Sequence, residues 1–344
     1  KAVRSSKKGI LMKVIIPTAG SGIRLRPHTF TSPKTLLHVV GRPILDYLLE
    51  PLLELPDLSE LIFIVGDNGE QIREYVERSY NLPVIYIWQN EQKGLGHAIS
   101  LAKARDNGEP VLILLGDKIF ECGYEKILQN PYTVIGVKTG ENPQGVGIVE
   151  TDGEFITRLI EKPAPPYSPR MQGDKGGFLV IEGVYYLHNS ELLFHCLDEI
   201  IERDIRSHNE YQLTDGLQLM VEYGEQMKVE FIDSLHCGTP DQLLDANRSI
   251  LEKRAPQVYR FPNSMIIPPV FIGENAVIEG AIIGPYASIG SGTQVVNAII
   301  KDTIIHPNAE LQDVLVNRSL IGPDARIYGS FRQFNIGSSA RIDL

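Results

Sequence analysis

The sequence predicts an α/β domain with a mostly parallel sheet, followed by a short parallel β-helix. Two observations lead to this prediction. Apolar strand segments alternate with amphipathic helix segments over residues 12–137, and in the last part of the chain aliphatic residues recur at every fifth or sixth position. Strands that are apolar on both faces are typical of a parallel sheet covered by helices. A six-residue period is typical of the faces of a β-helix.

The first segment contains four strand signals with helices between them. The strand signals are KVIIP (13–17), LIFIV (61–65), VIYIW (84–88) and VLILL (111–115). The helical signals are residues 43–55, 70–80 and 96–105. Ligands of such sheets bind beyond the carboxyl ends of the strands, so three loops deserve examination. These loops are residues 17–34, 89–96 and 116–119.

The middle of the chain is richer in β-type residues over 132–187, with a Pro-rich interruption at 162–169. The elements expected after it are helices near 190–203 and 213–223 and a strand at 226–232. In the stretch SLHCGTPDQLL, Thr239 suits an N-cap, Pro240 the first helical position and Gln242 a capping box. A further helix is therefore expected to begin there.

The last part of the chain repeats one hexapeptide. IGENAV, IGPYAS, IGSGTQ, IHPNAE and IGPDAR are near-copies of each other. Four isoleucines lie 17, 16 and 16 residues apart, as one coil of three such faces requires; they are Ile272, Ile289, Ile305 and Ile321. We expect three to four coils. The predicted organisation is a disordered leader or cloning remnant at 1–11, the α/β domain at 12–255, and the β-helix with a tail at 256–344.

Composition limits the functional classes. A formal net charge of -10 argues against a protein that coats nucleic acid or binds an anionic membrane. No apolar run reaches transmembrane length, and three scattered cysteines are too few for a disulfide framework. We expect a cytoplasmic protein whose partners are neither nucleic acid nor membrane.

The loop after the first strand, PTAGSGIRLRPHTFTSPK, combines glycines with cations. Gly20 and Gly22 allow a tight turn whose N–H groups can meet an anion, and Arg24, Arg26 and Lys34 add positive charge. The pattern is neither a dinucleotide fingerprint nor a Walker loop. The loop therefore favours phosphate binding over an ordinary βα turn with basic residues on its surface.

Polar residues in the other loops have two interpretations each. Asp117 at the end of VLILLGD suits either a Mg²⁺ ion carried by phosphates or a Gly-Asp turn. Gln89 could pair with a planar base edge, and His97 fits a packed or surface position better than a ligand. Glu161 and Lys162 of IEKP either face a pocket or form an exposed charge pair.

These motifs, in this order, resemble the sugar-1-phosphate nucleotidylyltransferases. Members of that family share a G-x-G-T-R…P-x-T…P-K loop, a Gly-Asp strand end, Glu-Lys-Pro and W-x-D-x-G-T-P. The resemblance covers nearly all of residues 12–330. Its nearest branch is the long-form glucose-1-phosphate thymidylyltransferases. This branch implies a Rossmann-like nucleotidyltransferase domain followed by a short left-handed β-helix.

The resemblance also implies roles for individual residues. The catalytic positions are Arg24, Lys34 and Lys162. The nucleotide-binding positions are Ala19, Gly20, Gly22, Gln89, Gly94 and Asp117. The sugar-phosphate positions are Gly147, Glu161, Lys162 and Tyr185. The metal position is Asp117, with His236 as the candidate second ligand.

The implied reaction transfers a nucleotidyl group from dTTP or UTP to a sugar-1-phosphate, with glucose-1-phosphate expected, and releases pyrophosphate. Its partners are the nucleoside triphosphate and the sugar-1-phosphate. The implied cofactor is Mg²⁺, with Mn²⁺ or another divalent ion as an alternative. We expect a homo-oligomer, with the β-helix as the candidate contact.

Four positions depart from the family pattern: Ile23, Lys118, Val146 and His236. His236 replaces the second metal aspartate, and Asp233 is no substitute because it faces the opposite side of an extended chain. A neutral imidazole is a poor Mg²⁺ ligand and a good ligand for Mn²⁺, Co²⁺ or Zn²⁺. Three interpretations stay open: Asp117 and phosphates suffice for Mg²⁺, a softer metal is used, or the chain is a weakened or inactive homologue that binds sugar nucleotides as a regulatory or sensor subunit.

A further alternative is acyl transfer on the β-helix, with His306 of IHPNAE as the base. Three to four coils make a short platform for such a site. We favour a β-helix that serves oligomer packing.

Overall fold

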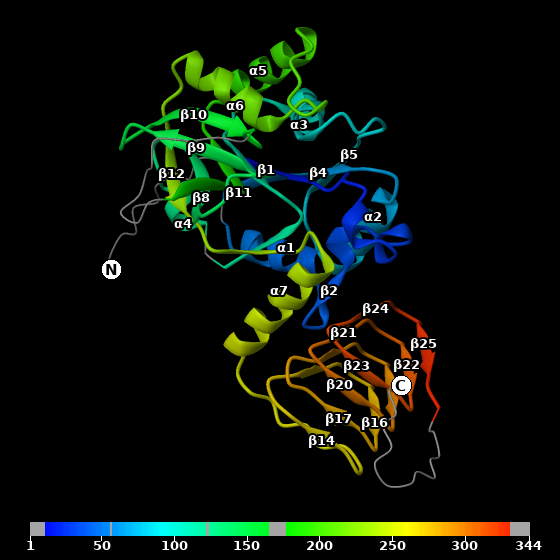
Figure 1. The fold of residues 1–344 in the computed structure, drawn as a ribbon. Helices are drawn as coiled ribbons and strands as arrows, with labels where there is room; N and C mark the ends of the chain where they lie inside the picture. The colour runs from blue at the N-terminus through cyan, green and yellow to red at the C-terminus, as the bar shows by residue number, and fades with distance from the viewer. Residues whose placement is uncertain (1–10, 56, 122–123, 165–176, 331–344) are drawn as a thin grey trace, which may run out of the picture. The chain divides into compact units, whose positions relative to one another are not determined.

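The computed structural model describes residues 11–55, 57–121, 124–164 and 177–330 (Figure 1). It divides into two compact units, residues 1–37 with 43–239 and residues 38–42 with 240–344. The boundary between these compact units precedes helix α7 (Pro240–Lys253), and the domain boundary at residue 255 stays a prediction. The predicted leader lies outside the described residues except for Leu11, as does most of the Pro-rich segment. No helix in the described ranges is long and apolar enough to cross a membrane.

A nine-stranded sheet forms the centre of the first unit. Its main path is β10-β9-β11-β6-β1-β4-β5, and β8 pairs with both β11 and β12. The four strands β6, β1, β4 and β5 are parallel, as their apolar sequences predicted, whereas β11 runs antiparallel to β6, β8 and β9. The strands are β1 (Met12–Pro17), β4 (Leu58–Val65), β5 (Val84–Trp88), β6 (Val111–Leu114), β8 (Thr133–Gly140), β9 (Gly147–Thr151), β10 (Ile156–Glu161), β11 (Phe178–Leu187) and β12 (Met227–Phe231).

Helices cover both faces of this sheet (Figure 1). Alternate residues of one strand enter opposite cores: Ile15 packs toward α3, α5 and α6, whereas Val14 packs toward α1, α2 and α4. The helices are α1 (Ile44–Leu53), α2 (Gly69–Ser79), α3 (Leu95–Ser100), α4 (Glu125–Leu128), α5 (Ser190–Glu202) and α6 (Leu213–Glu222). The helix expected at 96–105 is divided, because a 3₁₀ segment (Leu101–Arg105) follows α3.

A separate two-stranded sheet lies next to the end of β6. Strand β7 (Lys118–Phe120) pairs antiparallel with β13 (Ser234–His236), so that His236 lies opposite Lys118. The backbone N–H of Cys237 donates to the carbonyl oxygen of Asp117 at 2.9 Å. The SLHC segment is thereby held alongside the Gly-Asp turn.

The second unit contains three parallel sheets of four short strands each. The first has β14 (Met265–Ile266), β17 (Ile282–Ile283), β20 (Ile299–Lys301) and β23 (Leu315–Asn317). The second has β15 (Phe271–Ile272), β18 (Ser288–Ile289), β21 (Ile304–Ile305) and β24 (Leu320–Ile321). The third has β16 (Val277–Glu279), β19 (Gln294–Val296), β22 (Glu310–Gln312) and β25 (Arg326–Tyr328). This arrangement confirms a parallel β-helix and is consistent with the expected left hand.

The predicted isoleucine repeat is one interior ladder of this β-helix. Each of its four isoleucines pairs in register with the next, from Ile272 through Ile289 and Ile305 to Ile321. One corner repeats with the same period and has left-handed backbone, with φ of 57° at Asn275, 69° at Gly292, 61° at Asn308 and 57° at Asp324. Glycine, asparagine and aspartate tolerate this conformation best, so the corner residues set the coil length.

Asn247 explains why α7 belongs to the second unit. Its side chain is fully buried; it donates to the Tyr286 carbonyl at 3.1 Å and accepts from Ser288 Oγ at 2.6 Å. Its Oδ1 also accepts from the backbone N–H of Val40 at 3.2 Å. One amide therefore joins α7, the β-helix and the segment 38–42, which includes strand β2 (His38–Val39).

We predict that Ile289→Ala lowers the free energy of unfolding of the second unit by about 3 kcal/mol, because it leaves a cavity in the interior ladder. Denaturant unfolding of the purified chain measures this. Val277→Ala on the neighbouring face is the control; Val277 is 53% exposed, and we expect a change below about 0.5 kcal/mol. Equal losses in both variants would contradict the ladder as the source of stability.

Candidate functional site

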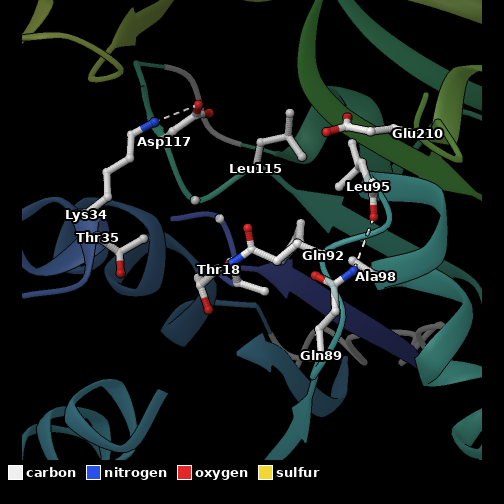
Figure 2. Close-up of a pocket in the computed structure, with 15 residues that line it drawn as sticks. Thr18, Lys34, Thr35, Gln89, Gln92, Leu95, Ala98, Leu115, Asp117 and Glu210 are labelled. Carbon is white, nitrogen blue, oxygen red and sulfur yellow. Dashed lines mark hydrogen bonds and ion pairs between the residues drawn. The ribbon is translucent and has the colours of Figure 1, made fainter. Parts of the chain in front are cut away.

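A cavity of about 300 Å³ opens at the carboxyl ends of β1, β5 and β6, where the sequence predicted a site. Figure 2 shows Lys34 and Asp117 at one end of the cavity and Gln89 at the other. The lining residues come from loops far apart in the sequence: Pro17, Thr18, Ala19, Gly20, Lys34, Thr35, Gln89, Gln92, Gly94, Leu95, Ala98, Leu115, Gly116, Asp117 and Glu210.

A second cavity of about 240 Å³ shares the glycine-containing loop as a wall. Ala19, Gly20 and Lys34 line both cavities, and Arg26 lines only the second. Gly22 has φ of +59°, a conformation that favours glycine, and starts the 3₁₀ turn of residues 23–25. The loop therefore presents backbone and cationic groups to two neighbouring cavities.

Gln89 is held in one orientation by its surroundings. Its side chain is buried, and its Nε2 donates to the Gly94 carbonyl at 3.3 Å and to His97 Nδ1 at 3.0 Å. Burial lowers the pKa of His97, which favours the neutral imidazole that can accept this hydrogen bond. His97 is thus a packed residue, as predicted, and it positions the amide of Gln89.

The glycines that follow Gln89 are required by a close approach of two backbones. Gly94 has φ of +110°, and a Cβ there would lie 2.5 Å from the Tyr211 carbonyl oxygen. The N–H of Gly96 donates to that same oxygen at 2.7 Å, and the N–H of Tyr211 donates to the Lys93 carbonyl at 2.8 Å. The segment before α6 therefore fixes the loop that carries Gln89.

Lys34 and Asp117 form an ion pair at the other end of the cavity, with Nζ–Oδ2 at 2.8 Å (Figure 2). Burial alone would raise the pKa of Asp117, but the charge and hydrogen bond of Lys34 hold it below its ordinary value. Gly116 permits the turn, because a Cβ there would lie 2.9 Å from Thr35 Cγ2. Asp117 is therefore a carboxylate at neutral pH, and 38% of its side chain is exposed.

Next to Asp117, a buried carboxylate collects cations. Glu182 on β11 has no exposed side chain, and it lies 3.1 Å from Lys118 Nζ, 3.0 Å from Lys138 Nζ and 3.2 Å from His236 Nε2. Ser234 Oγ also donates to it. We call these five residues the Glu182 cluster. Burial would raise the pKa of Glu182, but its hydrogen bonds to His236 and Ser234 and the charges of the lysines lower it to about 2.

The role of His236 as a second metal ligand stays a prediction, and its Nε2 is already in contact with an ammonium group. Nε2 lies 2.8 Å from Lys138 Nζ, which disfavours a metal ion on that nitrogen. The described residues contain no group of three or more His, Cys, Asp and Glu side chains that could hold a metal ion. Asp117 alone suits an ion that draws its other ligands from phosphates and water.

The predicted sugar-phosphate residues lie where β9 and β10 pair beside the end of β6. Gly147 is opposite Glu161, and a Cβ on it would lie 3.2 Å from Glu161 Oε2. Glu161 accepts from Thr214 Oγ1 at 2.8 Å and pairs with Lys162 Nζ at 3.3 Å. Glu161 and Lys162 therefore form a charge pair, and Thr214 of α6 holds the Glu161 side chain in place.

Seven predicted residues line neither cavity: Gly22, Arg24, Gly147, Glu161, Lys162, Tyr185 and His236. Arg24 is exposed on the 3₁₀ turn and lines neither cavity, whereas Arg26 does. Tyr185 is 3% exposed within the core that faces α5 and α6, and it lines neither cavity. Its position fits packing, and we leave it out of the proposed site.

Sequence reasoning missed several lining residues, namely Thr18, Thr35, Gln92, Leu95, Leu115 and Glu210. Thr18 and Gln92 lie in loops that were predicted to bind a ligand, so their place in these loops could have identified them. Gln92 Nε2 donates to the Ala19 carbonyl at 3.1 Å and ties the two loops together. Glu210 had no signal, because its loop follows a helix rather than a parallel strand.

His306 does not suit the acyl transfer alternative. It is 5% exposed and its ring centroid lies 5.5 Å from that of His38. An imidazole buried in this way is poorly placed to take a proton from a substrate.

The fold and the site together define a class, an α/β protein with a cavity at the carboxyl ends of its parallel strands. The nucleotidyl transferase family model matches residues 13–253, and the chain belongs to this family. It is 25% identical to the glucose-1-phosphate thymidylyltransferase of Streptomyces antibioticus, over 97% of this chain and 99% of that protein. It is 32% identical to the bifunctional protein GlmU of Methanococcus maripaludis, over 80% of this chain and 62% of that longer protein.

Among solved structures, a UDP-glucose pyrophosphorylase complexed with UDP-glucose matches with a TM-score of 0.61. The match has 22% identity and covers 71% of this chain and 100% of that one, which shows a shared fold. These relatives confirm the resemblance to sugar-phosphate nucleotidyltransferases, a family that typically uses a divalent metal.

The low pKa of Glu182 predicts a pH dependence of stability. A carboxylate whose pKa falls from 4.5 to about 2 on folding stabilises the protein above its unfolded-state pKa, and this contribution is lost as pH falls toward 2. We expect the melting temperature of Glu182→Gln to fall less steeply between pH 5 and pH 3 than that of the unmodified chain. Glu141→Gln, at an exposed position, should follow the unmodified chain. Calorimetry measures both, and parallel curves for all three proteins would refute the prediction.

Proposed function

We propose that the chain transfers a nucleotidyl group from dTTP or UTP to a sugar-1-phosphate, with glucose-1-phosphate as the first substrate to test, and releases pyrophosphate. The observation that carries this proposal is the cavity itself. It combines an oriented amide at Gln89 with the glycine-containing loop and the Lys34–Asp117 pair. Family membership restricts the chemistry to nucleotidyl transfer.

The Gln89 end of the cavity suits the base. Gly94 and His97 take both hydrogens of Gln89 Nε2, so its Oε1 is the atom left for the base, where it can accept from the N3–H of thymine or uracil. Leu95, Ala98 and Leu115 supply apolar surface around it. Desolvation there makes each hydrogen bond to the base more discriminating.

The loop of residues 19–26 suits the triphosphate. Ala19 and Gly20 stand between the two cavities, so a triphosphate can extend from the first into the second, where Arg26 lies. Backbone N–H groups and a guanidinium are the groups that bind phosphate oxygens well. Arg24, exposed on the same loop, stays a proposed contact that a substrate complex would test.

The chemistry requires positioning and charge neutralisation. An oxygen of the sugar-1-phosphate attacks the α-phosphorus, a new P–O bond forms, and the bond to the departing pyrophosphate breaks. In our proposal Lys34 lies beside the reacting phosphates, and Glu161 and Lys162 hold the sugar phosphate next to the end of β6. These cations stabilise the charge that develops on phosphate oxygens in the transition state.

A divalent ion, Mg²⁺ or Mn²⁺, is proposed to arrive with the triphosphate and to bind the protein through Asp117. One ionised carboxylate is enough for a Mg²⁺ ion that keeps its phosphate and water ligands. When bound, the ion neutralises negative charge on the phosphates. His236 has no part in this proposal.

A sensor or regulatory protein that binds sugar nucleotides without making them is the second candidate. The observation that favours it is the loss of the second metal carboxylate at His236, together with the ammonium beside it. The lysines and Asp117 favour catalysis.

We also propose a cytoplasmic homo-oligomer. The two described cysteines, Cys196 and Cys237, are buried free thiols, as expected in a reducing compartment. On one sheet of the β-helix Met265, Ile299 and Leu315 are 59%, 44% and 74% exposed, which would suit a contact between copies. Light scattering of the purified chain tests the oligomer.

We predict pyrophosphate release when the chain is incubated with glucose-1-phosphate and dTTP or UTP in Mg²⁺ or Mn²⁺. Lys162→Ala should lower kcat/KM about 100-fold, because a cation beside the sugar phosphate is lost. Lys126→Ala is the control, since Lys126 is 85% exposed on the short helix α4. Measurable nucleotide-sugar binding with no release for any triphosphate, sugar phosphate or metal would establish the sensor function instead.

We predict that Gln89→Leu raises the KM for dTTP and UTP about 10-fold or more, because the N3–H of the base loses its acceptor, Gln89 Oε1. The KM for glucose-1-phosphate should not change. Gln226→Leu, at an exposed position before β12, is the matched control. An unchanged KM for the nucleotide would remove Gln89 from the base site.

A further inference from the structure

The Glu182 cluster carries more positive charge than its own stability requires. Lys118 and Lys138 face one carboxylate, which leaves one positive charge in excess even with His236 neutral. Lys118 and Glu182 are 9% and 0% exposed at the side chain, so this charge is displayed by Lys138, at 38%. Cations with a reduced water shell are costly unless an anion completes them. The cluster is therefore a built site for an anionic group.

The cluster lies beside the reacting end of the cavity. Lys118 follows Asp117 directly, and β13 brings His236 opposite Lys118. Lys138 stands near the carboxyl end of β8, and β11 separates β8 from β9. Its Nζ lies 2.8 Å from His236 Nε2, so an anion at Lys138 would lie near the turn that carries Asp117.

We propose that the Lys138 ammonium is a fixed, phosphate-contacting cation for the sugar-1-phosphate, and that Glu182 is the residue that positions it. Lys138 replaces in part the positive charge that a metal ion bound at the His236 position would bring, since its contact with His236 Nε2 disfavours a metal ion there. Lys118 pairs with the same carboxylate. The single negative charge of Glu182 therefore does not cancel the positive charge of Lys138. This inference rests on the proposed function for the identity of the anion.

The contacts explain why Glu182 is buried. Its Oε1 faces Lys138 and its Oε2 faces Lys118, Ser234 and His236, so each oxygen of the carboxylate has its own cation. Lys138 Nζ also lies 2.8 Å from His236 Nε2, which restricts the ammonium from a second side. A cation held in this way binds phosphate without first losing the freedom of its long side chain.

The test is calorimetric titration of the full chain with glucose-1-phosphate and with inorganic phosphate in EDTA. The unmodified chain is expected to bind without metal, and Lys138→Gln should bind about 10-fold more weakly or worse. Lys138→Arg should restore affinity to within about threefold, because it keeps the charge. Lys126→Ala is the matched control, and the Kd for dTTP should stay within about twofold in every variant.

Two further variants separate the role of Glu182 from simple stability. Glu182→Gln removes a negative charge, which favours an anion, and also removes the anchor of Lys138. Weaker glucose-1-phosphate binding with intact dTTP binding would therefore support the positioning role of Glu182, and tighter binding would overturn it. His236→Asp adds a carboxylate beside Lys138, and it should weaken binding in EDTA about 10-fold by removing the excess charge. Circular dichroism checks folding, and Lys138→Gln carries the test if Glu182→Gln does not fold.

The outcomes are distinct. Binding in EDTA that is unaffected by Lys138→Gln, or no binding by the unmodified chain to either anion, would overturn this inference. Binding that depends on Lys138 without any pyrophosphate release would leave the anion site standing and refute the proposed transfer. If pyrophosphate is released and Lys138→Gln changes neither glucose-1-phosphate binding nor its KM, the proposed transfer stands and the anion site is refuted.

Discussion

The functional edge of the first unit depends on one buried carboxylate. Glu182 extends from β11 of the main sheet, and its partners lie on three other strands: Lys118 on β7, Lys138 on β8, and Ser234 and His236 on β13. Among the described residues, neither β7 nor β13 pairs with a strand of the nine-stranded sheet, so these ion pairs and hydrogen bonds are a principal link between the two sheets. A carboxylate without exposure is stable only when such partners offset its desolvation.

This constraint also explains two of the four departures from the family pattern. Lys118 and His236 are 118 positions apart in sequence, yet they lie opposite each other in the β7–β13 ladder and share Glu182 as a partner. The two departures therefore affect one place in the structure. Where the family pattern has a carboxylate beside the Gly-Asp turn, this chain has a cationic group that is anchored on Glu182. Nothing in the structure explains Ile23, which is exposed.

A second constraint is the close passage of backbones. The Tyr211 carbonyl lies so near the loop before α3 that only glycine fits at 94, and the same carbonyl accepts from the N–H of Gly96. Gln89 owes its fixed orientation to that loop and to His97. The site thus consists of loops whose geometry is set by rigid neighbours, which is how loop residues reach the precision that ligand binding requires.

The sequence by itself determined the elements whose signals are local or periodic. The parallel strands, the helices beside them and the isoleucine ladder were predictable, because alternation and a fixed repeat reflect burial directly. It also marked the loops that hold Gln89 and Asp117. Only the tertiary structure decided that Tyr185 is core, that Arg26 rather than Arg24 lines a cavity, and that α7 joins the β-helix through Asn247. It alone brought two lysines, His236 and Ser234 together around Glu182, because long-range contacts depend on strand order and register, and spacing along the chain does not encode these.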